Sequence, residues 1–113
     1  MKGDRLGEVE ELVLLTVYGL GSEAYGVNIL EKLEEDSRRT YSIGAVYAAL
    51  NRLEKKGCLR SQLGGITKER GGRRKRFFEI TRLGEETLRQ MRRVRERIWR
   101  RLDAKYPTQE ASK

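Results

Sequence analysis

The side chains best suited to bind another molecule lie in the segment YSIGAVYAALNRLEKKGCL, residues 41–59. Its apolar residues recur at helical spacing, so at about 100° per residue they occupy one side of a helix. The opposite side carries small residues, an amide and two cations, and no acid: Gly44, Ala45, Ala48, Asn51, Arg52 and Lys55. Amide and guanidinium groups pair with base edges, and ammonium groups bind phosphates. The segment therefore predicts a helix that lies close against a nucleic acid, although a small-residue face also suits packing against another helix.

The sequence lacks most of the residues that catalytic and metal sites usually contain. The chain contains no His and a single Cys, Cys58. A His-based triad therefore lacks its base, and a Cys/His zinc site, which needs about four ligands, lacks most of them. The acids lie mostly among other charges at the spacing of solvated helix faces. We therefore expect no enzymatic activity, no metal and no cofactor, and we expect Cys58 to fill space in the core.

The length and the cysteine count predict one small domain in a reducing compartment. A chain of 113 residues suits a single modest core. One Cys cannot form an intramolecular disulfide, which fits the cytoplasm. No apolar run approaches the ~20 residues of a membrane-spanning helix, so we expect no membrane association.

The charge is unevenly distributed along the chain. The net charge is +8, from 25 Lys and Arg against 17 Asp and Glu. Residues 1–36 carry three basic and nine acidic residues, whereas residues 37–113 carry 22 and eight. A basic region of this kind attracts a polyanion such as nucleic acid or an acidic membrane surface. The alternative is a cationic surface that serves only solubility.

Three helices are expected in the first half of the chain. An amphipathic stripe predicts the first over residues 6–20. Ser22 is the expected N-cap of a second helix over about residues 24–36, whose inward side chains are Val27, Leu30 and Leu33. Ser42 is the expected N-cap of the third helix, which ends at Gly57 because glycine tolerates the left-handed conformation. The inward residues of the third helix are expected to be Ile43, Val46, Leu50 and Leu53.

A change of period after Gly57 predicts a β-hairpin. Residues 58–63 and 75–81 alternate between apolar and polar side chains, and a glycine-bearing loop with a basic tip joins them. The residues expected to share one face of their strands are Leu59 with Leu63, and Phe78 with Ile80.

The last helix is expected to begin after Thr81, its N-cap, and to continue to about Lys105. Its apolar residues exceed what a three-helix core can cover, so a monomer would expose them as a patch that pairing across a two-fold axis would bury. The intervening arginines can pair with Glu85, Glu86, Glu96 or the acids of the first helix. Trp99 can also stack on a planar effector, although packing within the interface is the simpler interpretation. The expected dimer contacts are Leu88, Met91, Val94, Ile98, Trp99 and Leu102.

Three helices, a hairpin and a further helix predict a winged helix-turn-helix, a mostly α fold with a small β-hairpin. We expect a winged helix-turn-helix DNA-binding domain over residues 1–81, a C-terminal dimerisation helix over residues 82–106 and a flexible tail over residues 107–113. In this class the second helix of the helix-turn-helix enters the major groove of double-stranded DNA.

That geometry assigns roles to individual side chains. Asn51 would pair with adenine, Arg52 would reach guanine or phosphate, and Lys55 would contact phosphate. Ser42 and the free N–H groups beside it would hold a phosphate. Tyr47 is expected to pack, with its hydroxyl at the rim of the interface. The wing tip would meet the minor groove or the backbone through Arg73, Arg74, Lys75 and Arg76.

Four motifs in this order resemble the PadR family of bacterial transcriptional regulators: YGVNILEKL, SIGAVYAALNRLEKKGCL, GGRRKRFFEIT and LGEETL. The resemblance covers roughly residues 6–90. It implies a homodimeric repressor that binds a near-palindromic operator and controls its own operon or neighbouring transport or detoxification genes, and some members respond to small aromatic compounds. It carries DNA contact onto Ser42, Gly44, Tyr47, Arg73, Arg74 and Lys75, and dimerisation onto the last helix.

The sequence departs from the family pattern in two places. The second aromatic residue of the wing strand, often Tyr in the family, is Phe78, so a hydroxyl contact is absent there. The chain stops after a single C-terminal helix, which resembles the short-form subgroup. Two other functions remain open: a winged helix that binds a protein instead of DNA, and a non-specific binder of RNA or DNA.

Overall fold

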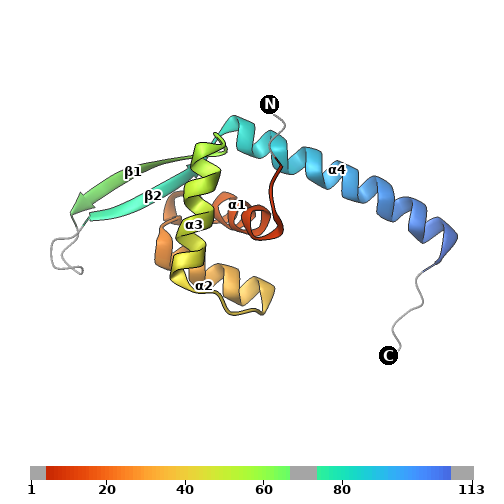
Figure 1. Cartoon of the computed structure of the whole chain (residues 1–113), viewed down its shortest axis with the longest axis horizontal. Coiled ribbons are helices and arrows are strands. Elements are labelled where there is room, and N and C mark those ends of the chain that lie inside the picture. Colours follow the sequence, from red (N-terminus) through yellow and green to blue (C-terminus); the bar gives the residue numbers. More distant parts are fainter. Residues whose placement is uncertain (1–4, 67–73, 108–113) are drawn as a thin grey trace.

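The computed structural model describes residues 5–66 and 74–107, and it has the order of elements that the sequence predicts. The helices are α1 (Glu8–Leu20), α2 (Gly26–Ser37), α3 (Ile43–Lys55) and α4 (Arg82–Lys105), and the strands are β1 (Leu59–Ile66) and β2 (Arg74–Ile80). As Figure 1 shows, α1, α2 and α3 gather in the middle, the hairpin extends to one side and α4 extends to the other. The molecule is therefore long and flat, measuring 57 × 39 × 21 Å. This is a winged helix-turn-helix followed by a long C-terminal helix, which confirms the predicted fold class.

The start of α2 differs from the prediction. Ser22 lies in a short 3-10 helix, Gly21–Glu23, and the N-cap position of α2 belongs to Tyr25. The helix begins late because the carbonyl of Ala24 accepts a hydrogen bond from the amide of Phe78, which draws this segment alongside β2. Val27 is exposed, and the inward face of α2 is centred instead on Gly26, Ile29 and Leu33.

The boundaries of α3 agree with the prediction. Ser42 Oγ accepts a hydrogen bond from the amide of Ala45 at 3.0 Å, and Gly57 has φ +81°, the left-handed conformation that follows a helix end. Val46, Leu50 and Leu53 are fully buried, as expected, together with Ala49. Ile43 is exposed instead of inward, because it occupies the first turn, where α3 has not yet reached the core.

The hairpin is antiparallel, with Leu59 opposite Ile80 and Ser61 opposite Phe78. Leu59 and Phe78 are buried. Leu63 shares their face but is exposed, because at Arg76, its partner, the hairpin has already left the core. A short bridge between Tyr25 and Phe77 attaches the base of the hairpin to the start of α2.

The last helix begins and ends where the sequence predicts. Thr81 Oγ1 accepts from the amide of Gly84 at 3.0 Å and donates to the carbonyl of Gly57 at 2.6 Å, so one side chain caps α4 and joins it to the end of the α3 turn. The start of α4 packs so closely on this turn that a Cβ atom at Gly84 would overlap the Cys58 carbonyl. Beyond its first turns, α4 leaves the core. No helix in the described ranges is long and apolar enough to cross a membrane.

Candidate nucleic-acid interface

The outward face of α3 carries the side chains that the sequence predicts. Gly44, Ala45, Ala48, Asn51, Arg52 and Lys55 are all exposed. The one acid within α3, Glu54, lies on a flank, where it accepts a hydrogen bond from the Ser61 hydroxyl at 2.8 Å. The outward surface of α3 therefore combines close backbone access with donors and positive charge.

Gly44 is not required by the fold of the chain itself. A Cβ atom added there would meet only Ser42 Oγ, at 4.0 Å. Glycine within a helix costs up to about 1 kcal/mol relative to alanine, so its presence in an open position needs another reason. Close approach of a second molecule to the start of α3 supplies one, and it is the use predicted for Gly44.

Tyr47 packs as expected against the helix before it. Its ring and hydroxyl lie over Gly26, where a Cβ atom would overlap them, so a larger residue at this position of α2 would require the Tyr47 side chain to move. The contact explains the Tyr25-Gly26 pair in structural terms. Tyr47 as a whole remains partly exposed at the edge of the α3 face.

The cations of the wing diverge instead of forming one cluster. The Lys75 ammonium lies 4.0 Å from the centre of the Tyr25 ring, and the rings of Tyr25 and Phe77 pack edge to face with centres 5.4 Å apart. Arg76, on the opposite face of β2, donates from Nη1 to the Ser61 hydroxyl at 2.8 Å. Arg73 lies outside the described residues, and only the backbone of Arg74 is described. Lys75 therefore anchors the wing as well as contributing charge to it.

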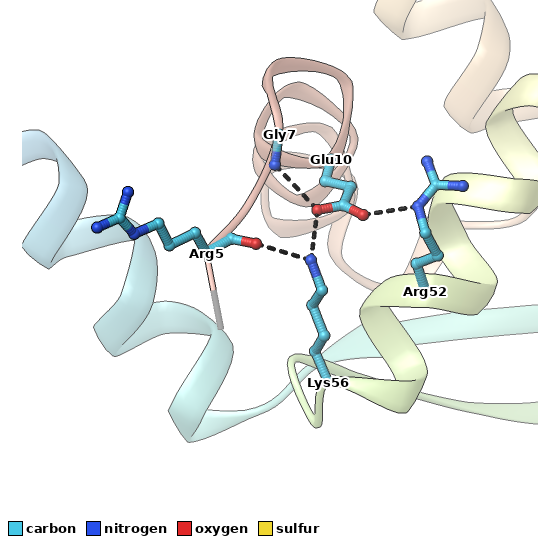
Figure 2. A network of polar contacts seen from close by, with 5 residues as sticks. All are labelled: Arg5, Gly7, Glu10, Arg52 and Lys56. Atoms are coloured by element: carbon cyan, nitrogen blue, oxygen red, sulfur yellow. Dashed lines mark hydrogen bonds and ion pairs between the residues drawn. The ribbon is translucent and has the colours of Figure 1, made fainter. Parts of the chain in front are cut away.

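A buried acid beneath α3 is the main feature that the sequence analysis missed. Glu10, near the start of α1, has a side chain that is only 7% exposed. Its Oε2 accepts from Arg52 Nε at 2.7 Å, and its Oε1 accepts from Lys56 Nζ at 2.8 Å and from the Gly7 amide at 3.0 Å, as Figure 2 shows. Lys56 also donates to the Arg5 carbonyl at 2.7 Å. We call this set of residues, Arg5, Gly7, Glu10, Arg52 and Lys56, the Glu10 network.

The electrostatics of Glu10 follow from these contacts. Burial alone raises the pKa of its carboxyl, but the hydrogen bonds from Lys56, Arg52 and the Gly7 amide outweigh burial and lower the pKa to about 2. Glu10 is therefore ionised at any physiological pH. Arg52, predicted as a free DNA contact, instead has its Nε occupied, and its remaining hydrogen-bonding capacity lies in the two terminal nitrogens.

The local sequence contained one signal for Glu10. A Glu three residues after Gly7 fits the capping position of a helix, and its carboxylate does accept the Gly7 amide. Its pairing with Arg52 and Lys56 joins residues more than 40 positions apart, and no local pattern indicates it.

The predicted dimer residues separate into two groups. Leu88 is only 5% exposed and belongs to the core of its own chain, so it is not available to a partner in the way that the sequence suggested. Met91 is half-buried, and the rest of the row is exposed, including Trp99 at 62%. An open hollow of about 1120 Å³ lies between Arg5, Leu6 and α4, and Met91, Val94 and Ile98 line its helical side. We call the half-buried Met91 and the exposed Val94, Ile98 and Leu102 the α4 row.

Four of the eight arginines of α4 form the expected pairs with acids in the described part of the chain. Arg82, Arg89 and Arg92 form ion pairs with the acids one turn away, Glu86, Glu85 and Glu96. Arg95 reaches an acid of the first helix, Glu11, at 2.8 Å. The Tyr18 hydroxyl donates to Glu85 at 2.8 Å, and this bond together with Arg89 lowers the pKa of Glu85. These contacts fix the direction in which α4 leaves α1.

In the described part of the chain, no three His, Cys, Asp or Glu side chains are grouped to hold a metal ion.

The helix-turn-helix, the acid-free outward face of its second helix and the adjoining wing define the winged-helix class of DNA-binding proteins. The family model described as the transcriptional regulator PadR-like family matches residues 14–90, and the chain belongs to this family. It is therefore a DNA-binding transcriptional regulator. No curated protein matches the sequence.

Solved structures of PadR-type proteins resemble the whole chain. A PadR-like transcription factor from Bacteroides fragilis has a TM-score of 0.71 at 20% identity, over 85% of this chain and 87% of that one. A PadR-like transcriptional regulator from Bacillus cereus has a TM-score of 0.70 at 19% identity, over 89% and 93%. A PadR family transcription regulator from Clostridium difficile has a TM-score of 0.66 at 20% identity, over 90% and 100%. At these identities the likeness shows the fold.

Proposed function

We propose that the chain acts in the cytoplasm as a homodimeric repressor that binds a near-palindromic operator. The observation that carries the DNA-binding half of this proposal is the exposed, acid-free face of α3. Gly44, Ala45 and Ala48 allow close approach, and Asn51 is exposed on the same face, where its amide can pair with an adenine edge. The N–H groups at the start of α3 and the Ser42 hydroxyl receive a phosphate.

The α4 row supports the homodimer. Met91, Val94, Ile98 and Leu102 recur at three- and four-residue spacing, so they form one apolar strip on a helix that has left its own core. Arg95, which flanks the strip, is already paired with Glu11, so this cation would not meet a second copy unpaired. A two-fold axis through this strip would place two α3 helices about 34 Å apart or at a multiple of that distance.

Repression of its own or neighbouring transport and detoxification genes is the regulatory role that we propose. An operator that overlaps a promoter is blocked by a bound dimer without any further machinery. A small aromatic effector is a second candidate feature, and the exposed Trp99 beside the α4 row supports it, since a flat indole stacks on planar compounds.

The proposal is tested by selection from a random duplex library, followed by fluorescence anisotropy at several salt concentrations. We expect an inverted repeat to be enriched and to bind ~10³-fold or more tightly than a scrambled duplex of equal length. Equal binding to both duplexes, lost steeply with salt, would contradict the proposal and indicate a non-specific binder. No measurable binding to any duplex would instead favour a protein-interaction module.

A further inference from the structure

We propose that Glu10 is a positioning residue for DNA recognition, which holds the guanidinium of Arg52 with its terminal nitrogens facing the bound duplex. The inference rests on the proposed contact between α3 and DNA. Glu10 itself does not touch DNA, because it is buried behind α3, at the start of α1.

The geometry of Arg52 divides its donors between two partners. Its Nε is committed to Glu10 at 2.7 Å, and Figure 2 shows the two terminal nitrogens directed away from that carboxylate. The Arg52 side chain is nonetheless 53% exposed, so these nitrogens are accessible. Arg52 follows Ala45 by two helical turns and Ala48 by one, which places it along the edge of the same outward face. A guanidinium bound on one edge can still present its other edge to a phosphate or to guanine.

The Lys56 side chain binds the other oxygen of the Glu10 carboxylate, Oε1. It is largely buried, and its ammonium is held between Glu10 Oε1 and the Arg5 carbonyl. With the Gly7 amide on the same oxygen, Glu10 is fixed at both ends of its carboxylate. A carboxylate held this firmly fixes in turn the one flexible group that remains exposed, Arg52.

The physical benefit is preorganisation. A free arginine side chain loses much of its rotamer freedom when it binds, and that loss weakens the complex. Glu10 removes the freedom before DNA arrives, so the Arg52 contact forms at lower entropic cost. The disadvantage is one negative charge near a polyanion, which weakens attraction to every duplex alike. Positioning by Glu10 should strengthen specific binding, whereas the negative charge of Glu10 should weaken binding to every duplex. The two effects can therefore be measured separately.

The test compares Glu10→Gln with Glu11→Gln, its neighbour on α1. Both variants lose one negative charge and one or more ion pairs, but Glu11 pairs with Arg95 on α4 and has no contact with Arg52. We expect Glu10→Gln to lower the ratio of operator affinity to scrambled-duplex affinity ~10-fold, the size of one lost base contact, while binding to the scrambled duplex stays equal or tightens. Glu11→Gln is expected to keep the ratio of the native chain. Equal ratios in the two variants would overturn the proposal.

A second background separates positioning from general stabilisation. In Arg52→Ala, Glu10→Gln should change the affinity ratio no further, because the side chain that it positions is gone. A purely structural Glu10 would lower the ratio equally in both backgrounds, and that result would also overturn the proposal. If the native chain itself fails to discriminate between duplexes, the proposed function fails; if it discriminates but Glu10→Gln behaves as Glu11→Gln does, positioning alone fails.

If Glu10→Gln does not fold, the proposal can still be tested by a measurement on the native chain. The Arg52 Nε–H group should give a separate NMR signal with slow solvent exchange in the free protein, and its order should change little when operator is added. An Arg52 signal that exchanges rapidly in the free protein and becomes ordered only on the duplex would overturn the proposal.

Discussion

The outward faces of α3 and α4 are both rich in cations, but they differ in where the accompanying acids lie. On α3 the acid that forms an ion pair with Arg52 is Glu10. It is buried beneath the helix, so the exposed face carries no negative charge. On α4 the acids stand in the open beside their arginines, one turn away. Exposed pairs of this kind contribute only a few tenths of a kcal/mol each. They lower the positive charge near an apolar row, although the cations of α4 still outnumber its acids.

The difference indicates what each face is suited to meet. An acid-free cationic face next to small residues suits a polyanion with a groove, whereas an exposed row of apolar side chains suits a second copy of the same helix. The largest expected effect therefore comes from putting an acid into the apolar row, and the smaller effects come from single contacts on α3.

Ile98→Glu is expected to abolish the dimer and to reduce operator affinity ~10³-fold, because each half-site would then be bound by a separate chain. Analytical ultracentrifugation gives the mass, and anisotropy gives the affinity. The matched control is Ala104→Glu, which makes the same charge change on the opposite face of α4. A dimer that survives Ile98→Glu would mean that the α4 row is not the interface.

The buried acid should make stability depend on pH in a specific window. The pKa of Glu10 falls from its ordinary value of 4.5 to about 2 on folding, so the contribution of the group is fully present above pH 4.5 and is lost as the pH falls towards 2. That shift corresponds to about 3 kcal/mol. Urea unfolding at one fixed protein concentration, followed by circular dichroism, should show the stability gap between the native chain and Glu10→Gln closing across this window.

The matched control for that experiment is Glu11→Gln, the neighbouring position on α1. This variant breaks the ion pair with Arg95 but keeps Glu10, so its stability should still fall as the pH drops from 4.5 towards 2, as that of the native chain does. A gap between the native chain and Glu10→Gln that is independent of pH would contradict the role assigned to the ionised carboxylate.

Asn51→Ala is expected to cost about 1–3 kcal/mol of operator affinity and to relax the preference for one base pair in each half-site. The side chain is exposed on the outward face of α3, so stability should be unaffected. Anisotropy against a panel of duplexes that vary at one position measures both effects. An equal loss on every duplex in the panel would show that Asn51 does not discriminate between bases.

Lys55→Ala has the smallest expected effect. As a phosphate contact, Lys55 should add to the binding of all sequences alike, and its removal should reduce the salt slope by about one. A salt titration with the operator and with a scrambled duplex measures the slope. A loss confined to the operator would move Lys55 from the phosphate-binding group to the base-reading group.

Local signals predicted most of the architecture. Ser42 and Thr81 cap their helices through bonds to amides three residues away, and Gly57 ends α3 by its own conformation, so nearby sequence is sufficient for all three. The misplaced start of α2 has a distant cause, since Ala24 pairs with β2, more than 50 residues later. Leu88 was assigned to the dimer because periodicity alone cannot show where α4 leaves the core.

The candidate site was also predictable where its features depend on nearby sequence, and not where they depend on distant residues. The small and polar face of α3 follows from helical spacing and is observed. The contact between Glu10 and Arg52 does not follow from helical spacing, because it depends on the angle at which α1 crosses α3. That angle is set by packing in the core, which includes Val13, Val17, Val46 and Leu50. A charged residue at the start of an amphipathic helix looks solvated in the sequence, and only the fold buries Glu10.

The most direct test of which face meets DNA uses the unmodified chain and compares Lys55 on α3 with Lys105 at the end of α4, both of them exposed. The rate at which each lysine is acetylated can be followed by mass spectrometry, with and without saturating operator duplex. We expect the duplex to protect Lys55 strongly and to leave Lys105 unchanged. Protection of Lys105 with continued modification of Lys55 would contradict the assignment of α3 to DNA and of α4 to the dimer.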